Sequence, residues 1–168
     1  MAKPRIVILG AGLGGAIAAF EIKDAVGDKA EVSVVSQGDT FHFVPSNPWV
    51  AVHWRKRAAI EVKLPPVFQT GVGAKPVLPA KNQLELNDGE TVDYDYLVIA
   101  TGPDLAFDEI PGLGPHGGFT QSVCHVDHAE TAAAAFDRFV ENPGPIVVGA
   151  VQGASCFGPA YEFAMILD

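Results

Sequence analysis

A glycine-rich turn near the start of the chain limits the possible folds more than any other feature. Residues 6–9 (IVIL) form a continuous apolar run, as in a strand buried on both faces of a parallel sheet. The motif GAGLGG follows at 10–15, and the next ten residues, AIAAFEIKDA, predict a helix. Here Gly10 permits a tight turn, Gly12 lets a phosphate approach the backbone, and Gly15 lets helix and strand pack closely. This strand–turn–helix context predicts a dinucleotide-binding turn, with the pyrophosphate on the helix N-terminus.

The composition limits the class of protein. A chain of 168 residues is long enough for one domain, and a hydrophobic content of 48% provides a core, while 18 Gly and 13 Pro predict many loops. A net charge of −9 argues against a nucleic-acid partner. Two cysteines do not make a disulfide framework. The N-terminus lacks a signal-peptide pattern and no apolar run approaches the ~20 residues of a membrane span, so we expect the isolated chain to be soluble.

The strand, turn and helix described above, together with the next apolar run, predict an α/β, Rossmann-like fold with a parallel sheet. Residues 31–36 (EVSVVS) predict its second strand. Ser36 then takes the position where an acidic residue usually binds the ribose hydroxyls, and serine can still form a weaker hydrogen bond there. No arginine stands at this point to receive a 2′-phosphate, so NADP is disfavoured at this site.

A small β-hairpin excursion and another buried strand follow. The alternating segments QLELN and TVDYDYLVIA, joined by an Asp-Gly pair, predict a hairpin over 83–100. Its last residues are apolar and stop abruptly at Thr101 and Gly102. A parallel strand that ends in such a turn brings backbone N–H groups to the carboxyl edge of the sheet, where ligands bind. We therefore assign residues 1–103 to a dinucleotide-binding domain.

The stretch 39–57 within this domain, DTFHFVPSNPWVAVHWRKR, allows two interpretations. Its two prolines and its Ser-Asn pair predict no regular element. One interpretation is a surface loop with Trp49 and Trp54 packed on the core. The other is a loop over a cofactor ring, with the basic residues 55–57 near phosphates or lipid headgroups.

Residues 104–168 predict a crossover followed by the start of a second Rossmann-like unit. A helix is expected over 127–140, with Asp127 as its N-cap and Glu130 at the N3 position. IVVGA at 146–150 predicts a buried strand that leads into another turn and helix. Because the sequence ends within that helix, we expect this second unit to be an incomplete, truncated domain.

The second glycine turn departs from the dinucleotide-binding pattern. It retains Gly149, but Val151 and Ala154 replace the other two glycines. The branched side chain of Val151 would occupy the space through which a pyrophosphate approaches the backbone. We therefore expect no nicotinamide dinucleotide to bind at residues 149–158.

Four residues are candidates for chemistry: Cys156, Cys124, Glu162 and His128. Cys156 lies in the second turn just before a helix, whose N-terminus would lower the pKa of a thiol, although cysteine is also a common buried apolar residue. Glu162, nearly two helical turns later, either relays protons or faces solvent. Cys124, His125 and His128 are too few ligands at too close a spacing for the usual zinc sites, so no metal is expected.

Several stretches together resemble the N-terminal part of bacterial and archaeal sulfide:quinone oxidoreductases. They are FHFVPSNPWV followed by WRKR, then YDYLVIATGP, QSVCHVDHAE and GASCFGPAYEFA. These enzymes are FAD flavoproteins of the pyridine nucleotide-disulfide oxidoreductase superfamily. The resemblance covers nearly the whole chain. The stretch GASCFGPAYE is specific to the sulfide:quinone oxidoreductases, whereas GxGxxG and ATGP are shared across the superfamily.

The resemblance implies that FAD is the cofactor. The residues that would hold it are Gly10, Gly12, Gly15, Ser36, Thr101 and Gly102. The resemblance also makes Cys156 one of two redox cysteines and gives Cys124 an auxiliary role. Sulfide would then be oxidised through cysteines and flavin, and the electrons would pass to quinone.

In this family the partner redox cysteine, the quinone pocket and the amphipathic membrane-binding segments lie in the C-terminal half. We therefore expect the isolated chain to be inactive, and the parent enzyme to be a peripheral membrane protein. The sequence does not decide whether the protein forms a homo-oligomer. Two alternatives remain: an NADH-dependent flavoprotein reductase of the same superfamily, and a non-catalytic module that binds FAD or another subunit.

Overall fold

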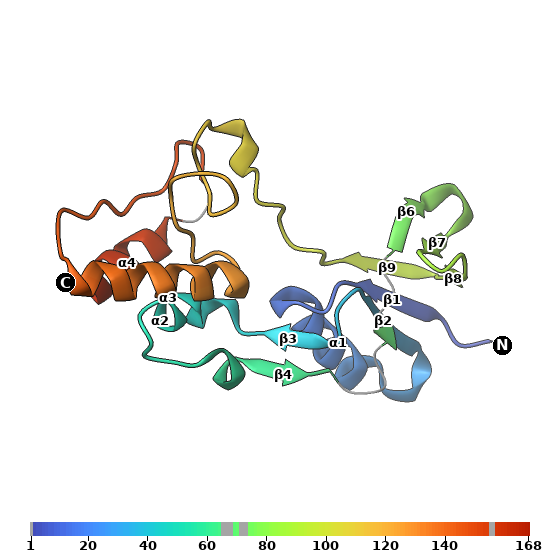
Figure 1. Cartoon of the computed structure of the whole chain (residues 1–168). Coiled ribbons are helices and arrows are strands. Elements are labelled where there is room, and N and C mark those ends of the chain that lie inside the picture. The colour runs from blue at the N-terminus through green and yellow to red at the C-terminus, as the bar shows by residue number, and fades with distance from the viewer. Residues whose placement is uncertain (1, 65–68, 71–73, 155–156) are drawn as a thin grey trace. The chain divides into compact units, whose positions relative to one another are not determined.

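The chain folds into two compact units in the computed structural model, which describes residues 2–64, 69–70, 74–154 and 157–168 (Figure 1). The first unit comprises Met1–His42 and Val62–Asp104, and the second comprises Phe43–Glu61 and Leu105–Asp168. Most of the stretch 39–57, which the sequence places within residues 1–103, therefore belongs to the second unit.

A four-stranded parallel sheet forms the centre of the first unit, in the order β5-β2-β1-β9. Its strands are β1 (Arg5–Leu9), β2 (Glu31–Ser36), β5 (Gln69–Thr70) and β9 (Tyr96–Ile99). Leu9 is level with Val35 on one side and with Ile99 on the other. The three predicted apolar runs are thus neighbouring strands that end at one edge, which confirms the α/β fold with a parallel sheet.

Helix α1 (Leu13–Val26) links β1 to β2, as the glycine motif predicts. Its N-cap is Gly12, and it ends at Gly27, whose φ of 54° lies in the left-handed region that favours glycine. Helix and sheet share a core of small and branched apolar side chains: Ile8, Ala11, Ala19 and Val34. This packing holds the start of α1 directly beyond the end of β1.

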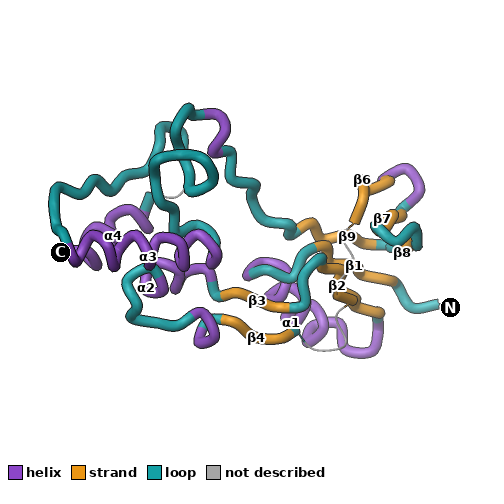
Figure 2. Tube along the Cα trace, in the orientation of Figure 1, coloured by secondary structure: helices purple, strands orange, loops and turns teal. Residues whose placement is uncertain are grey.

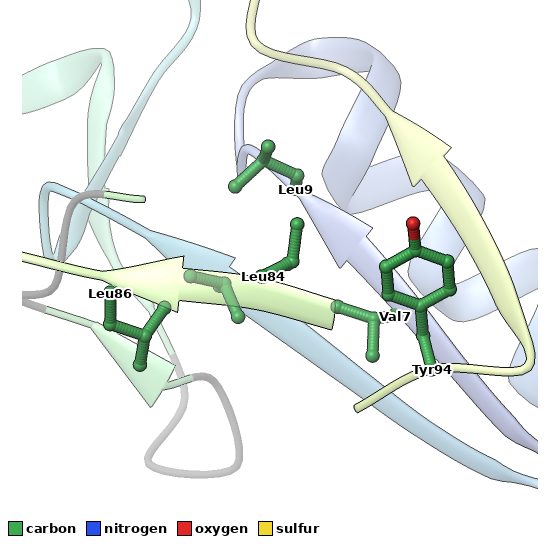
Figure 3. Close-up of a cluster of buried hydrophobic side chains, with 6 residues drawn as sticks. Val7, Leu9, Leu84, Leu86 and Tyr94 are labelled. Carbon is green, nitrogen blue, oxygen red and sulfur yellow. The ribbon is translucent and has the colours of Figure 1, made fainter. Parts of the chain in front are cut away.

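A small antiparallel sheet, in the order β6-β7-β8, completes the first unit. Its strands are β6 (Ala74–Leu78), β7 (Gln83–Leu86) and β8 (Thr91–Asp93). Leu84 and Leu86 of β7 are fully buried in one cluster with Val7, Leu9 and Tyr94 (Figure 3). The alternation of QLELN therefore marks the face of the strand that is buried in this core.

The predicted hairpin is confirmed, with Gly89 at a φ of 91° in its turn. The return segment is two strands rather than one. Between β8 and β9, the Asp95 carboxylate accepts a hydrogen bond of 2.7 Å from the Arg5 backbone N–H, and the Asp95 N–H donates to the Arg5 carbonyl. These bonds turn the chain from the antiparallel sheet into the parallel one.

The chain leaves the first unit through β3 (Thr40–His42) and returns through β4 (Glu61–Lys63), which pair with each other. The prediction of no regular element over 39–57 is wrong. Besides β3, this stretch contains a 3-10 turn and the short helix α2 (Asn47–Val50). Pro48 is compatible with α2 because it lies in the first helical turn, where the backbone N–H has no intrahelical partner.

The second unit packs α2 against two longer helices, α3 (Val126–Glu141) and α4 (Gly158–Leu167). Its core combines residues from both parts of the chain: Val50, Ala51, Ile60, Val126, Ala129 and Ala132. Small alanines along α3 allow α2 to approach it closely. The helices expected at 127–140 and after residue 157 are thereby confirmed.

The start of α3 differs from the capping-box prediction. The N-cap is His125, whose Nδ1 accepts a hydrogen bond of 3.4 Å from the Asp127 N–H. The two side chains predicted to cap the helix, Asp127 and Glu130, bind Arg57 instead, Glu130 at 2.8 Å. Arg57 also binds Glu61 of β4. These carboxylates, Glu130 above all, raise the pKa of Arg57. The ion-pair network ties the 57–61 turn to α3, a tertiary contact that local sequence does not encode.

The strand expected at 146–150 is not formed. Figure 2 shows this segment as loop, and the side chain of Val147 is 94% exposed. A parallel strand requires a hydrogen-bonded neighbour, and no segment within the described ranges pairs with this one. Among the described residues, no helix is both long enough and apolar enough to cross a membrane.

Candidate functional site

The glycine turn at the carboxyl edge of the first sheet is built by close backbone contacts. The Gly10 N–H donates to the Val35 carbonyl at 2.8 Å, and the Ala100 N–H donates to the Leu9 carbonyl at 2.8 Å. Gly10 has a φ of 104°, and a Cβ there would collide with the Ala100 carbonyl. A Cβ on Gly15 would likewise collide with the Gly10 carbonyl oxygen. Folding itself therefore requires glycine at positions 10 and 15.

Gly12 differs from these two glycines. A Cβ at this position would have no atom within 4 Å among the described residues, and its φ of −72° and ψ of −167° suit any residue. Gly12 caps α1 without a side-chain hydrogen bond, and the first turn of α1 contains no acidic side chain. The first N–H groups of a helix lack intrahelical partners and carry partial positive charge. The turn thus fits a phosphate group, which would lie where a larger side chain at position 12 would project.

The other predicted binding residues lie at the same edge of the sheet. Ser36 is the last residue of β2, adjacent to the Val35 carbonyl that receives the Gly10 N–H. Thr101 and Gly102 follow the end of β9, and Gly102 has a φ of 76° with open space where a Cβ would stand. The structure therefore brings the six predicted cofactor-binding residues together at the ends of three neighbouring strands.

In the second unit, Glu162 of α4 is held by the indole of Trp49. The Trp49 Nε1–H donates to Glu162 Oε1 at 3.2 Å. The Arg55 guanidinium lies 4.0 Å above the Trp49 ring centroid, and Arg55 also donates to the buried Ser46 hydroxyl at 2.6 Å. Arg55 and Arg57 are thus bound within the unit, a use of the basic cluster that neither interpretation of residues 39–57 included.

Of the two cysteines, only Cys124 lies among the residues that the structure describes. Cys124 is a free, exposed thiol just before α3, and its N–H donates to the Ser122 hydroxyl at 3.1 Å. Cys156 lies outside the described residues. The helix that follows it, α4, begins without an acidic residue in its first turn and without a side-chain cap.

His128 of α3 is buried, with 8% of its surface exposed. Its Nε2 lies 3.1 Å from Nε2 of His116, and its ring packs edge-on against Phe107 at 5.6 Å between centroids. Burial lowers the pKa of His128, and the neighbouring His116 and His125 lower it further, while Asp127 acts in the opposite direction. Burial thus favours the neutral form of the His128 imidazole.

In the described part of the chain, the side-chain hydrogen bonds of Glu162 and His128 do not join the candidate catalytic residues to one another. They connect Glu162 to Trp49 and His128 to His116. The sequence had not identified His116, and it had not linked Trp49 to Glu162. The only sequence feature that marks His116 is its place in a glycine-rich loop, LGPHGG, which gives no indication of the helix it contacts.

Stability should depend on pH through His128. Because its pKa is lower in the folded chain than in the unfolded one, the unfolded chain binds a proton first as the pH falls below the ordinary histidine pKa. We expect the free energy of unfolding to decrease from about pH 8 to about pH 5, and this decrease to be smaller in His128→Asn. Urea unfolding of both proteins at the two pH values measures it. The same pH-dependent loss in both would contradict the prediction.

Comparisons with known proteins give a consistent result. The family model described as pyridine nucleotide-disulphide oxidoreductase matches residues 4–155. The sulfide-quinone reductase of Aquifex aeolicus is 36% identical over 99% of this chain and 39% of its own length. The mitochondrial sulfide:quinone oxidoreductase of Dictyostelium discoideum is 25% identical over 98% of this chain and 38% of its own length.

A solved structure agrees with the sequence matches. The X-ray structure of the Aquifex aeolicus sulfide:quinone oxidoreductase superposes with a TM-score of 0.88, at 36% identity, over 99% of this chain and 39% of that one. The chain therefore spans about two fifths of the length of the relatives it matches.

Proposed function

Since the chain belongs to the pyridine nucleotide-disulphide oxidoreductase family, we propose that it is the FAD-binding part of a sulfide:quinone oxidoreductase. In this function sulfide loses two electrons and a quinone takes them up. The relatives that carry this name match almost the whole chain, one of them at 36% identity. These matches favour this function over the NADH-dependent reductase and over a non-catalytic module.

The observation that carries the proposal is the open glycine turn at Gly12. The family binds FAD, and the N-terminus of α1 presents free N–H groups and no carboxylate to a pyrophosphate. Ser36, at the end of β2, would hydrogen-bond the ribose, and Thr101 and Gly102 would line the cofactor from the end of β9. When bound, FAD supplies the two-electron redox chemistry.

Four residues would serve the chemistry at the sulfide side. Cys156 would carry the sulfur as a persulfide, formed when sulfide attacks its disulfide bridge with the partner redox cysteine and that partner leaves as a thiolate. The start of α4 favours a Cys156 thiolate because a helix N-terminus stabilises negative charge. Cys124 would act as an auxiliary thiol. Glu162, held by Trp49, would exchange protons with solvent, and neutral His128 would act as a base.

Quinones partition into lipid, so the complete enzyme would work at a membrane surface and bind sulfide and quinone as its small-molecule partners. The second glycine turn supports quinone rather than nicotinamide as the redox partner. Val151 and Ala154 stand where a dinucleotide-binding motif has glycine, and the Ala154 N–H is taken by the Val151 carbonyl at 3.1 Å.

Anaerobic reduction of the full-length flavoprotein tests the function. In a stopped-flow experiment, sulfide is expected to bleach the flavin absorbance, and an added quinone to restore it. NADH at the same concentration is expected to leave the absorbance unchanged, because residues 149–158 lack the glycines of a nicotinamide site. Bleaching by NADH and not by sulfide would favour the NADH-dependent reductase. No bleaching by either would favour the non-catalytic module.

A further inference from the structure

The side chain of His128 forms a hydrogen bond through one of its two ring nitrogens. Its Nε2 lies 3.1 Å from Nε2 of His116, a residue twelve positions earlier that enters from the loop before α3. The other nitrogen, Nδ1, is buried and has no hydrogen-bond partner among the described residues. His116 itself is exposed, so water can pair with its second ring nitrogen.

This asymmetry distinguishes the two neutral forms of His128. With the proton on Nδ1, the ring would bury an N–H donor that has no partner among the described residues, and buried N–H groups are almost always paired in folded proteins. With the proton on Nε2, the ring donates to His116, and only a lone pair on Nδ1 is left without a partner. A neutral imidazole has one donor and one acceptor nitrogen, so His116 then accepts at Nε2 and carries its own proton at Nδ1, facing water.

We propose that His116 is a positioning residue that fixes the tautomer of His128, with the proton on Nε2 and the lone pair on Nδ1. A histidine held in one tautomer by a partner at its second nitrogen is the arrangement by which proteins orient a catalytic base. His116 thus leaves Nδ1 as the ring nitrogen of His128 that carries a lone pair. The use of that base in sulfide oxidation depends on the proposed function, whereas the tautomer does not.

The surroundings favour a neutral ring in this pair. Phe107 packs against His128 from the preceding loop, and His125 lies with its ring centroid 5.6 Å away at the start of α3. The charged or titratable groups that act on His128 are His116, His125 and Asp127. Two imidazolium rings at this separation would repel each other and leave no acceptor between them. The bond therefore requires an unprotonated nitrogen on one of the two rings, and in the proposed tautomer that ring is His116.

Nitrogen-15 NMR of the histidine rings in the 168-residue chain, without flavin or sulfide, tests the assignment at a pH above the ordinary histidine pKa. We expect His128 to be protonated at Nε2 and unprotonated at Nδ1. In His116→Leu the ratio of this tautomer to the other should fall about tenfold, the equivalent of one hydrogen bond. His116→Gln, whose side-chain carbonyl can accept the same proton, should restore most of the ratio. His53→Leu is the matched control, since His53 binds α3 through a different residue, Asp137, at 2.7 Å.

A wild-type His128 protonated at Nδ1 would overturn the proposal, as would an unchanged tautomer ratio in His116→Leu. An equally large fall of the His128 tautomer ratio in His53→Leu would also overturn the proposal, because the effect would then reflect the stability of α3. These measurements need neither cofactor nor substrate. A full-length flavoprotein that fails to oxidise sulfide, together with a His116-dependent tautomer in the 168-residue chain, would refute the proposed function alone.

Discussion

Replacing Gly12 with valine is expected to abolish FAD binding while leaving the fold intact. The new side chain would project into space that no described atom occupies within 4 Å of its Cβ, at a backbone conformation open to any residue. The protein therefore tolerates it, with a loss of at most about 1 kcal/mol from changing the N-cap. A pyrophosphate approaching the N-terminus of α1 would meet the valine side chain instead of bare backbone.

Fluorescence titration with FAD and thermal unfolding separate the two effects. We expect the FAD dissociation constant of Gly12→Val to rise by about 100-fold or more, which corresponds to about 3 kcal/mol of lost binding. The melting temperature should fall by only a few degrees. Gly144→Val is the matched control, because Gly144 is equally open but lies in the second unit. It should bind FAD normally.

Gly15→Val provides the opposite pattern. Its Cβ would collide with the Gly10 carbonyl, so this variant should lose stability as well as binding. Normal FAD affinity in Gly12→Val would show that the cofactor does not approach the backbone at this turn. An unfolded Gly12→Val would show that the open space there is filled in solution.

Cys156→Ser in the full-length enzyme is expected to retain FAD and to lose sulfide-dependent quinone reduction by at least about 1,000-fold. Serine cannot carry a persulfide, and the loss of a covalent nucleophile removes a step that other residues do not replace. FAD binding should persist because the turn at Gly12 belongs to the first unit and Cys156 to the second.

Cys124→Ser is the matched control and should retain a measurable fraction of the rate. The two thiols precede different helices. The first turn of α4 has no acidic residue and no side-chain cap, so its N-terminus favours a thiolate in the residues just before it. Cys156 should therefore react with iodoacetamide faster than Cys124 near neutral pH, as read by peptide mass spectrometry. Faster alkylation of Cys124, with Cys156 accessible, would contradict the assignment.

The sequence by itself predicted the strands β1, β2 and β9, the helix α1 and the β7–β8 hairpin of the first unit. An uninterrupted apolar run identifies a strand buried on both faces, and the spacing of Gly10, Gly12 and Gly15 reflects local backbone conformation. The Asp-Gly pair before the return strand determines the hairpin turn for the same reason. These features depend on neighbouring residues, so they can be predicted from pattern alone. The roles of Gly10 and Gly15 agree with the collisions that a Cβ would make there.

Only the tertiary structure decided the contacts of the second unit. Asp127 and Glu130 form a plausible capping box in sequence, but Arg57, some seventy residues away, binds both side chains. The run at 146–150 has the composition of a strand, yet a strand forms only where a neighbour accepts its hydrogen bonds. The partnerships of His128 with His116 and of Glu162 with Trp49 likewise depend on how separate segments pack together. Side-chain hydrogen bonds between distant segments follow from packing geometry, and no local periodicity records that geometry.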